Sequence, residues 1–331
     1  MTRILAIETS CDETAAAIVE NGRHVLSNVI HTQIPLHTLY GGVVPEIASR
    51  NHVDMLPPVV QKALSDASLP LESIDAIAAT YGPGLVGTLL TGLSYAKGLS
   101  FALGKPFIGI NHIEGHVAAN YLSKPAPKPP FVCLVASGGH SQIMHVSDFT
   151  RLTLIGKTRD DAAGESFDKV ARALGLSYPG GPALESLAEN GNPSAVRFHS
   201  SFNENDSFDF SFSGIKTAAI NYIHTHSQKN EAVNTTDVAA SFQYAVISIL
   251  AKKAVRAASN TALALAGGVS ANKALRQTLK TLCSERSIPL FLPDFSYCTD
   301  NAAMIGSAAY FHFIKKDVSP FSLNAVANLS L

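Results

Sequence analysis

The chain has 331 residues, of which 46% are hydrophobic and 15% are charged, and its formal net charge is −1. This length predicts one large or two medium α/β domains with an ample apolar core. A net charge near zero excludes a global field that would attract nucleic acid or an anionic membrane. Any basic surface for nucleic acid must therefore be local or supplied by a partner.

Cysteine spacing and the N-terminus indicate the compartment. The four cysteines show no C-x-x-C spacing and suit a reducing compartment better than a disulfide framework: Cys11, Cys133, Cys283 and Cys298. Met1 leads directly into an apolar strand pattern, which leaves no room for a signal or transit peptide. No uninterrupted apolar run approaches membrane-spanning length. We therefore expect a soluble, cytoplasmic protein without membrane association.

The chain opens on a strand, a tight polar turn and a second strand. Ile4–Ile7 is apolar, residues 8–13 form the turn, and Thr14–Val19 is β-prone. The same pattern recurs in residues 131–146, with its turn at Ser137–Ser141. Two copies of one strand-turn-strand unit predict two related halves.

Helical and strand patterns alternate along the rest of the chain. Residues 44–67 have helical spacing, although Pro57 and Pro58 are expected to kink or divide this helix. The alternation predicts mixed sheets with helices packed on their faces. The remaining predicted strands are 74–80, 106–110, 262–266 and 289–292, and the remaining predicted helices are 85–103, 162–174, 215–226, 236–258, 271–282 and 301–315. The proline-rich stretch Ser123–Pro130 is the best linker and marks the lobe boundary.

Two histidines follow the strand at 106–110. His112 and His116 are spaced i, i+4, which places them on one helix face, near enough to ligate one metal ion. Open α/β sheets build sites at the carboxyl ends of their strands. A single histidine here would be read as a surface residue, but the spaced pair favours a metal site. Asp300, directly before a helical pattern, is either an N-cap or a third ligand, and this ligand set suits Zn²⁺ and Fe²⁺ about equally.

The histidine pair does not match a peptidase motif. Glu114 stands two residues after His112, so it is misplaced for the general base of H-E-x-x-H. Gly115 occupies the position where H-x-x-E-H requires glutamate. A peptidase interpretation therefore lacks its base.

Three polar or glycine-rich turns each follow an apolar strand, at residues 8–13, 137–141 and 267–270. Glycine lets backbone N–H groups approach a ligand and form an anion-binding nest, and Ser270 is expected to cap a helix beginning near Ala271. One such turn would be only a turn, but three in two repeated halves favour a nucleotide or phosphorylated ligand. The G-x-G-x-x-G match at Gly82–Gly87 is discounted as a dinucleotide site because Pro83 stiffens the turn.

Carboxylates form the other candidate groups. Asp12 and Glu13 could orient a cation or act as acid and base, although ordinary turn composition also explains them. Asp160 and Asp161 precede a predicted helix, where capping and the helix dipole are a sufficient explanation. Asp168 lies within this predicted helix and would grip ligand hydroxyls.

Several segments together match a known family. They are Ile7–Thr14, Lys97–Gly98 with Pro106 and His112–Val117, Ser137–Ser141, Phe210–Thr217, Gly267–Asn272 and Cys298–Ala302. From Ile4 to about Gly306 the chain resembles the TsaD family of tRNA N6-adenosine threonylcarbamoyltransferases, once labelled O-sialoglycoprotein endopeptidases.

The resemblance implies a two-lobed α/β fold of the actin-like ATPase (Hsp70/sugar kinase) type with duplicated mixed-sheet domains. Residues 1–125 would form the N-terminal lobe, 126–300 the second lobe, and 301–331 a helix returning to the first. The implied activity is metal-dependent transfer of an L-threonylcarbamoyl group from threonylcarbamoyl-AMP to N6 of adenosine 37 in tRNAs reading ANN codons. The implied partners are tRNA, a TsaB-type paralogous subunit and a TsaE-type ATPase.

The resemblance also assigns residues. His112, His116 and Asp300 would hold one Fe²⁺ or Zn²⁺ per chain. The adenylate, and also ATP or ADP, would bind residues of the second lobe: Val135, Ala136, Ser137, Gly138, Gly139, Asp168, Gly181 and Asn272, with weaker roles for Glu185, Gly267 and Gly268. Asp12 and Glu13 are candidate catalytic groups. Competing interpretations are a non-catalytic actin-like ATP-binding regulator, a metallopeptidase and an ATP-dependent small-molecule carbamoyltransferase of the same fold.

Overall fold

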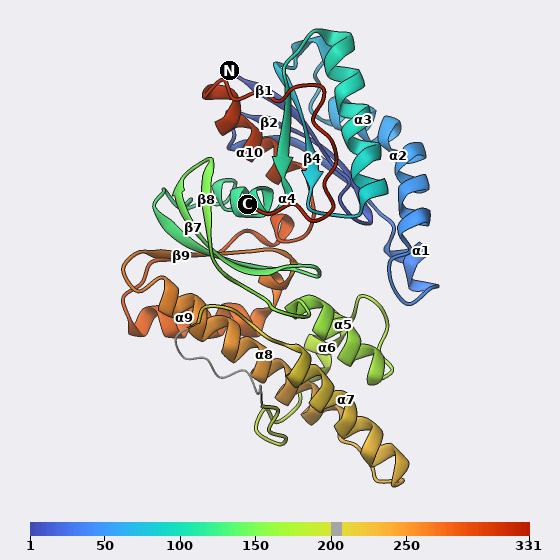
Figure 1. The fold of residues 1–331 in the computed structure, drawn as a ribbon, viewed down its shortest axis with the longest axis vertical. Coiled ribbons are helices and arrows are strands. Elements are labelled where there is room, and N and C mark those ends of the chain that lie inside the picture. Colours follow the sequence, from blue (N-terminus) through green and yellow to red (C-terminus); the bar gives the residue numbers. More distant parts are fainter. Residues whose placement is uncertain (200–206) are drawn as a thin grey trace. The chain divides into compact units, whose positions relative to one another are not determined.

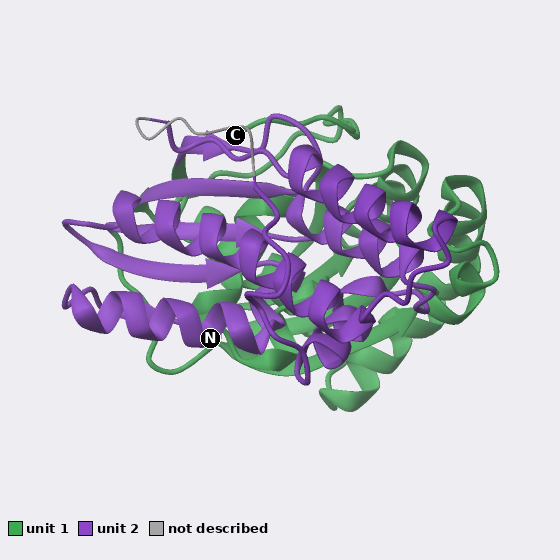
Figure 2. Ribbon diagram, turned by 90° about the horizontal axis from the view of Figure 1, so that it is seen from below, with its two compact units in different colours: residues 1–129, 147–152, 293–331 green, residues 130–146, 153–292 purple. Residues whose placement is uncertain are grey.

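The computed structural model describes residues 1–199 and 207–331 and divides them into two compact units (Figure 2). Unit 1 comprises Met1–Pro129, Ser147–Leu152 and Pro293–Leu331, and unit 2 comprises Pro130–Val146 and Thr153–Leu292. The lobe boundaries predicted from the sequence were 125/126 and 300/301. The unit boundaries lie at 129/130 and 292/293, and unit 1 also takes the short segment 147–152.

Unit 1 is built on a five-stranded mixed sheet (Figure 1). Its strands are β1 (Arg3–Glu8), β2 (Glu13–Glu20), β3 (His24–Thr32), β4 (Ala76–Gly82) and β5 (Phe107–Asn111), in the order β3-β2-β1-β4-β5. β1 pairs antiparallel with β2 and parallel with β4. The apolar side chains of β1 and β4 are buried on both faces, which requires helices on both sides.

Three long helices cover the sheet of unit 1. α2 (Pro45–Asp66) and α3 (Val86–Leu103) pack on one face, and α10 (Ala302–Ile314) lies on the other (Figure 1). Shorter elements complete the unit: α1 (Ile34–Thr38), η1 (Leu71–Ser73), α4 (His112–Ala118), η2 (Ala119–Tyr121) and η4 (Phe295–Tyr297).

The prolines of α2 do not divide it, because α2 continues unbroken from Pro45 to Asp66 across Pro57 and Pro58. Prolines inside a helix cost about 3 kcal/mol through lost hydrogen bonds and steric clash. A continuous buried stripe on this helix offsets that cost: Ala48, His52, Leu56, Val59, Val60 and Ala63. Burial of this stripe against the sheet therefore outweighs the local preference of the two prolines.

Unit 2 repeats the sheet topology of unit 1. Its strands are β6 (Phe131–Ala136), β7 (Ser141–Asp148), β8 (Arg151–Lys157), β9 (Ala262–Ala266) and β10 (Leu290–Phe291), in the order β10-β9-β6-β7-β8. β6 pairs antiparallel with β7 and parallel with β9, just as β1 pairs with β2 and β4. The predicted duplication of mixed-sheet domains is confirmed.

Helices of unit 2 pack around a central α8 (Thr235–Ala257). The others are α5 (Ala163–Ala173), α6 (Gly180–Ala188), α7 (Ser213–Gln228), η3 (Gly268–Ala271) and α9 (Lys273–Glu285). Within the described part of the chain, α8 alone is long and apolar enough, by length and composition, to cross a membrane, but 67% of its most apolar window is buried inside the fold. A core helix meets the same criteria.

Asp160 and Asp161 were expected to cap the helix that follows them, and that prediction is wrong. Ala162 is the N-cap residue of α5. Asp160 instead accepts hydrogen bonds from the hydroxyls of Ser211 and Ser213 and from the backbone N–H of Phe212, at the start of α7. Asp161 pairs with Lys169 and Lys216. Both carboxylates thus tie α5 and α7 together, a tertiary role that local sequence could not reveal.

Candidate metal centre and glycine cradle

The histidine pair lies on a short, buried helix at the end of β5. The Asn111 side chain caps this helix, α4, by accepting a hydrogen bond from the Ile113 N–H at 2.8 Å. The i, i+4 spacing then brings the rings of His112 and His116 together, with their centroids 4.5 Å apart. Both side chains are almost completely buried. The predicted strand at residues 106–110 is therefore present as β5, and the histidine pair lies on a helix directly after it, as expected.

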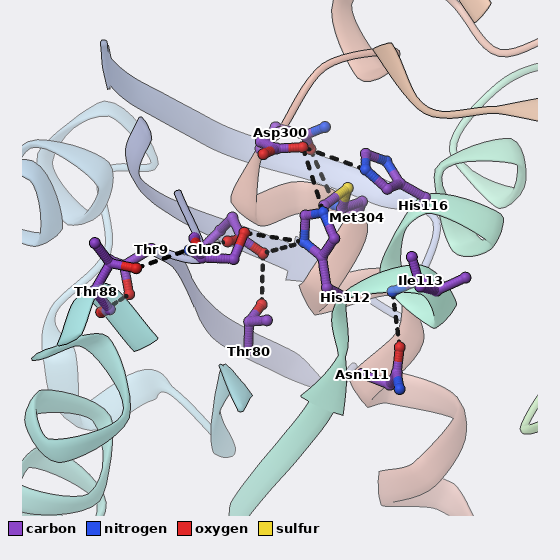
Figure 3. Close-up of polar contacts among 12 residues, drawn as sticks. Glu8, Thr9, Thr80, Thr88, Asn111, His112, Ile113, His116, Asp300 and Met304 are labelled. Atoms are coloured by element: carbon purple, nitrogen blue, oxygen red, sulfur yellow. Dashed lines mark hydrogen bonds and ion pairs between the residues drawn. The ribbon is translucent and has the colours of Figure 1, made fainter. Parts of the chain in front are cut away.

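Asp300 approaches both histidines from the loop before α10 (Figure 3). Its Oδ1 lies 3.2 Å from His116 Nε2 and 3.6 Å from His112 Nε2. The N-cap of α10 is Asn301, whose side chain accepts from the Met304 N–H at 3.0 Å. Of the two roles considered for Asp300, the N-cap is therefore wrong, and one candidate ligand atom from each of the three residues lies within 4.8 Å of the others.

Glu8 supports His112 from behind, a contact that the sequence analysis missed. Its Oε2 lies 3.2 Å from His112 Nδ1 and accepts a 2.5 Å hydrogen bond from the Thr80 hydroxyl (Figure 3). The Ser10 N–H donates to the other carboxylate oxygen at 2.5 Å. A carboxylate that accepts the Nδ1 proton leaves Nε2 as the free ligand atom of an imidazole, and this arrangement is usual behind metal-bound histidines.

The charges of this cluster are strongly interdependent. Burial alone would lower the pKa of His112, but the carboxylates of Asp300 and Glu8 raise it to about 9. Burial and the neighbouring His112 lower the pKa of His116. Burial would raise the pKa of Glu8, but attraction and hydrogen bonding to His112 lower it overall. The cluster thus contains a neutral imidazole, that of His116, and a protonated imidazole, that of His112, whose charge the carboxylates of Glu8 and Asp300 balance.

His116 provides the test of whether a metal ion fits. Both of its ring nitrogens are buried and neither has a hydrogen-bond partner within the described residues, although Asp300 is at ion-pair distance. A buried polar nitrogen without a partner costs free energy. A divalent cation at this point would satisfy His116, and two imidazole nitrogens with one carboxylate suit Zn²⁺ or Fe²⁺ and leave positions for a substrate. The residues therefore fit such an ion.

The turn between β1 and β2 carries the two candidate catalytic carboxylates. Asp12 is buried, whereas Glu13 is partly exposed and accepts a hydrogen bond from the Thr32 hydroxyl at 3.2 Å. Burial, together with the charges of Asp12 and Asp300, raises the pKa of Glu13 to about 9. Glu13 is therefore a protonated acid at neutral pH, which favours a donor role over a base role.

His52 of α2 holds this same turn in place and was not identified from the sequence. Its Nε2 lies 2.9 Å from the Cys11 carbonyl and its Nδ1 lies 2.7 Å from the Thr14 hydroxyl. A carbonyl only accepts, so Nε2 carries the proton and Nδ1 accepts from Thr14. Burial lowers the pKa of His52, in keeping with this neutral tautomer. The only sequence signal was its position on the buried stripe of α2.

Glu114, which lies between the two histidines in the sequence, forms an ion pair with His312 of α10. Its Oε1 lies 2.6 Å from His312 Nε2, and His312 Nδ1 lies 2.8 Å from Asp317 Oδ2. Carboxylates only accept, so both imidazole nitrogens donate and His312 is a cation. Burial would lower the pKa of His312, but Glu114 and Asp317 raise it to about 9. Glu114 is thus committed to an ion pair, which agrees with its exclusion as a peptidase base.

In unit 2, four glycines among the residues predicted to bind the adenylate face open space, and we call this group the glycine cradle. A Cβ added to Gly138, Gly139, Gly181 or Gly268 would meet nothing within 4 Å, so internal packing does not require glycine at these positions. Gly267 differs, because its φ is +85° and a Cβ would lie 2.4 Å from the Ala136 carbonyl oxygen. The four open glycines therefore leave room for a ligand, and Gly267 shapes the backbone behind them.

The other residues predicted to bind the adenylate also belong to unit 2. Val135 and Ala136 are completely buried at the end of β6, directly before the turn that begins at Ser137. Ser137 closes its turn by donating its N–H to the His140 carbonyl at 2.7 Å. Asp168 Oδ1 accepts from the N–H groups of Gly180 and Gly181 at 2.8 and 3.3 Å, and burial raises its pKa.

Asn272 and Glu185 meet at the start of α9. The Asn272 side chain, and not that of Ser270, caps a helix here, accepting from the Leu275 N–H at 2.9 Å, so the predicted Ser270 cap is wrong. Its amide donates to Gln243 at 2.8 Å, a residue that the sequence analysis did not identify. Glu185 accepts from the Lys273 N–H at 2.6 Å, and burial raises its pKa.

Solved structures share this fold at low sequence identity. HypF from T. kodakarensis aligns with a TM-score of 0.64 and 13% identity, over 97% of this chain and 49% of that protein. Component A of (R)-2-hydroxyglutaryl-CoA dehydratase from Acidaminococcus fermentans aligns with a TM-score of 0.59 and 15% identity, over 95% of this chain and 99% of that one. The chain is an α/β protein of the actin-like ATPase and sugar kinase fold class, as predicted.

Sequence comparison identifies the family. The profile of TsaD, tRNA N6-adenosine threonylcarbamoyltransferase, matches residues 24–307. Proteins of that name from Clostridium botulinum (strain Kyoto / Type A2) and Clostridium perfringens (strain ATCC 13124) are 54% and 55% identical over 331 residues, covering 99% of this chain and 97–98% of theirs. The chain belongs to the TsaD family, and the predicted resemblance is confirmed.

The ion pair of His312 gives a pH-dependent stability. The folded-state pKa of His312, about 9, lies above its unfolded value of about 6.5, so the stabilisation is complete below pH 6.5 and is lost as the pH rises through 9. We expect wild type to exceed His312→Gln in unfolding free energy by about 1–3 kcal/mol at pH 6.5, and the difference to shrink towards zero by about pH 10. Urea titrations across this range measure it, and a pH-independent difference would contradict the assignment.

Proposed function

We propose that this chain transfers the L-threonylcarbamoyl group from threonylcarbamoyl-AMP to N6 of adenosine 37 in tRNAs reading ANN codons. In this reaction the N6 amine attacks the carbamoyl carbonyl carbon, a C–N bond forms, the bond to the AMP phosphate oxygen breaks, and the amine loses a proton. The observation that carries the proposal is the buried cluster of His112, His116 and Asp300 in a chain of the TsaD family.

His112, His116 and Asp300 would hold one Fe²⁺ or Zn²⁺ per chain. Such an ion supplies Lewis-acid polarisation of the carbamoyl carbonyl. Glu8 orients the His112 ring through Nδ1, and the Asn111 cap fixes the start of the helix that carries both imidazoles. These contacts hold two nitrogens and one carboxylate oxygen ready before substrate arrives, which lowers the cost of organising the site during the reaction.

The cradle of unit 2 would hold the adenylate. Backbone N–H groups of Gly138, Gly139 and Gly268 suit an anionic phosphate, because glycine permits close approach of the main chain. Asp168 and Asn272 would contact the nucleoside, with Gly181 leaving space beside Asp168 and a lesser role for Glu185. The same residues would accept ATP or ADP.

Asp12 is the better candidate to take the proton from the attacking amine. Glu13, with a pKa raised to about 9, would donate a hydrogen bond or proton instead, for example to the leaving group. His52 holds the backbone of the turn that presents both carboxylates. An adenosine in an RNA loop is accessible to such groups without opening of a duplex.

Two alternative functions are less well supported. A regulator that only binds ATP would have no use for the buried, unbonded nitrogens of His116 beside Asp300. A metallopeptidase would need a general base near the histidines, and Glu114 is paired with His312 instead.

A TsaB-type paralogous subunit would dock on the outer face of α2 and α3. A groove of about 430 Å³ lies between these helices, lined by Val53, Leu56, Leu90, Thr91, Ser94 and Tyr95. Val53 and Leu90 are 60% and 41% exposed. Charges nearby are already paired, as in Arg50–Glu46 and Lys62–Asp66, so this face suits an apolar protein surface better than RNA.

A TsaE-type ATPase would complete the system, and tRNA would be bound by the assembly. The cytoplasm is the proposed location. Its reducing conditions suit four cysteines that are all free thiols, three of them buried.

Reconstitution tests the transfer reaction directly. With threonylcarbamoyl-AMP and unmodified tRNA, the assembled wild type should yield threonylcarbamoyladenosine, detectable by mass spectrometry of nucleosides. We expect His116→Ala to lose bound metal and at least about 10²-fold in rate, because the site loses a central ligand. His224→Ala, which removes an exposed histidine of α7, is the control. Full activity of His116→Ala would exclude the metal-dependent mechanism.

Alanine variants of the neighbouring residues Gly267 and Gly268 should affect different properties, stability in one case and ligand binding in the other. Gly268→Ala should fold with wild-type stability and bind ADP about tenfold or more weakly, because its methyl group would project into the open cradle. Gly267→Ala should instead lower stability by about 1 kcal/mol or more, because of its positive φ and the contact with Ala136. Calorimetric titration and thermal unfolding measure the two effects. Unchanged ADP affinity of Gly268→Ala would argue against the cradle.

Charges placed in the groove test the docking surface. The double variant Val53→Asp/Leu90→Asp should no longer co-elute with the paralogous subunit, because two carboxylates would be buried in an apolar interface. Val318→Asp, at an exposed apolar position elsewhere in unit 1, should co-elute like wild type. Size-exclusion chromatography measures complex formation. Co-elution of the double variant would place the partner on another face.

A further inference from the structure

The three candidate metal ligands come from only two elements of unit 1. His112 and His116 belong to α4, and Asp300 lies two residues before α10 begins at Ala302. α4 has seven residues, which is too short for a helix to be stable by itself. The distance between the histidine nitrogens and the Asp300 carboxylate therefore depends on how α4 is held against α10.

Close packing holds the middle of α4. A Cβ added to Gly115 would lie 2.5 Å from Ile305 Cδ1 and 3.4 Å from Met304 Cγ, so glycine lets the two helices approach closely without displacing the Ile305 side chain. Met304 lies beside the histidine cluster (Figure 3). This contact sets the spacing of the helices but, as an apolar contact, does little to prevent α4 from rotating or sliding.

A second attachment lies further along α10. Glu114 Oε1 is 2.6 Å from His312 Nε2, and Asp317 Oδ2, 2.8 Å from His312 Nδ1, fixes the plane of that ring. The side chains of Glu114 and His312 are only 9% and 16% exposed, so water weakens this ion pair little. His312 lies ten residues beyond Ala302, roughly 15 Å along the helix axis. The pair therefore fixes the direction of α4 relative to α10.

We propose that Glu114 and His312 are positioning residues for the metal centre. Their ion pair, together with the Gly115 contact, holds α4 in the orientation that brings the nitrogens of His112 and His116 to Asp300. Glu114 has no role as ligand or base in this arrangement, and among the described residues the ligand cluster consists of His112, His116 and Asp300. The inference rests on the metal site of the proposed function, but it assigns a task to Glu114, a residue of the family segment His112–Val117 that the transfer reaction does not use.

Metal binding by the full chain provides the test. Co²⁺ is the probe, because its visible absorption reports coordination geometry, and Zn²⁺ competition gives affinity. We expect Glu114→Gln and His312→Ala to bind about 10- to 100-fold more weakly than wild type, with altered Co²⁺ spectra. The double variant should be no weaker than the weaker single variant, because both remove one interaction. Glu46→Gln, which breaks an exposed ion pair of α2, should bind like wild type.

The outcomes distinguish this inference from the proposed function. Wild type that binds neither ion would overturn both. Wild type that binds metal, with Glu114→Gln and His312→Ala matching its affinity and Co²⁺ spectrum, would overturn the positioning role alone, even if both variants were less stable. Circular dichroism establishes that each variant is folded. If His312→Ala does not fold, Glu114→Gln, which keeps the side-chain volume, decides the matter by the same two measurements.

Discussion

The His112 imidazole lies between two carboxylates in the interior of unit 1, and the organisation of the site depends on this contact. Burial of charged groups is tolerated only when partners compensate for lost hydration. Glu8 from the end of β1 and Asp300 from the loop before α10 provide these partners. The cluster needs side chains from the end of β1, from α4 and from the loop before α10. It therefore holds these three elements together.

In unit 2, the residues proposed to bind the adenylate depend on backbone conformation and backbone hydrogen bonds more than on side-chain charge. Gly267 is required by its own backbone conformation, whereas Gly138, Gly139, Gly181 and Gly268 face open space. Asp168 accepts hydrogen bonds from the first turn of α6, and Asn272 caps the start of α9. Under the proposed function, the two repeated sheets would carry different chemistry, imidazoles and carboxylates in unit 1 and main-chain donors in unit 2.

Departures from the predicted elements arise where a long-range contact replaces a local preference or where a neighbouring residue takes the cap. Pro57 and Pro58 remain inside α2 because a buried stripe compensates for them. Asp160 leaves the helix beside it and binds the start of α7, more than fifty residues away. Asn301, one residue before α10, takes the capping role that was one of two alternatives for Asp300, and Asn272, one residue before α9, takes the role predicted for Ser270. Because Asn301 caps α10, the Asp300 carboxylate is available to the two histidines.

Sequence alone determined the duplicated α/β organisation, the helical histidine pair and the family, because each of these is written in local periodicity or in contiguous motifs. His112 and His116 need only one turn of helix to come together. The tertiary structure decided which distant groups lie around that pair. Glu8 and Asp300 contact the histidines, His312 contacts Glu114, and His52 contacts the turn that carries Asp12 and Glu13. These contacts join residues 41 to 198 positions apart, so no local pattern encodes them. Only packing of the helices on the sheet brings them within hydrogen-bonding or ion-pairing distance.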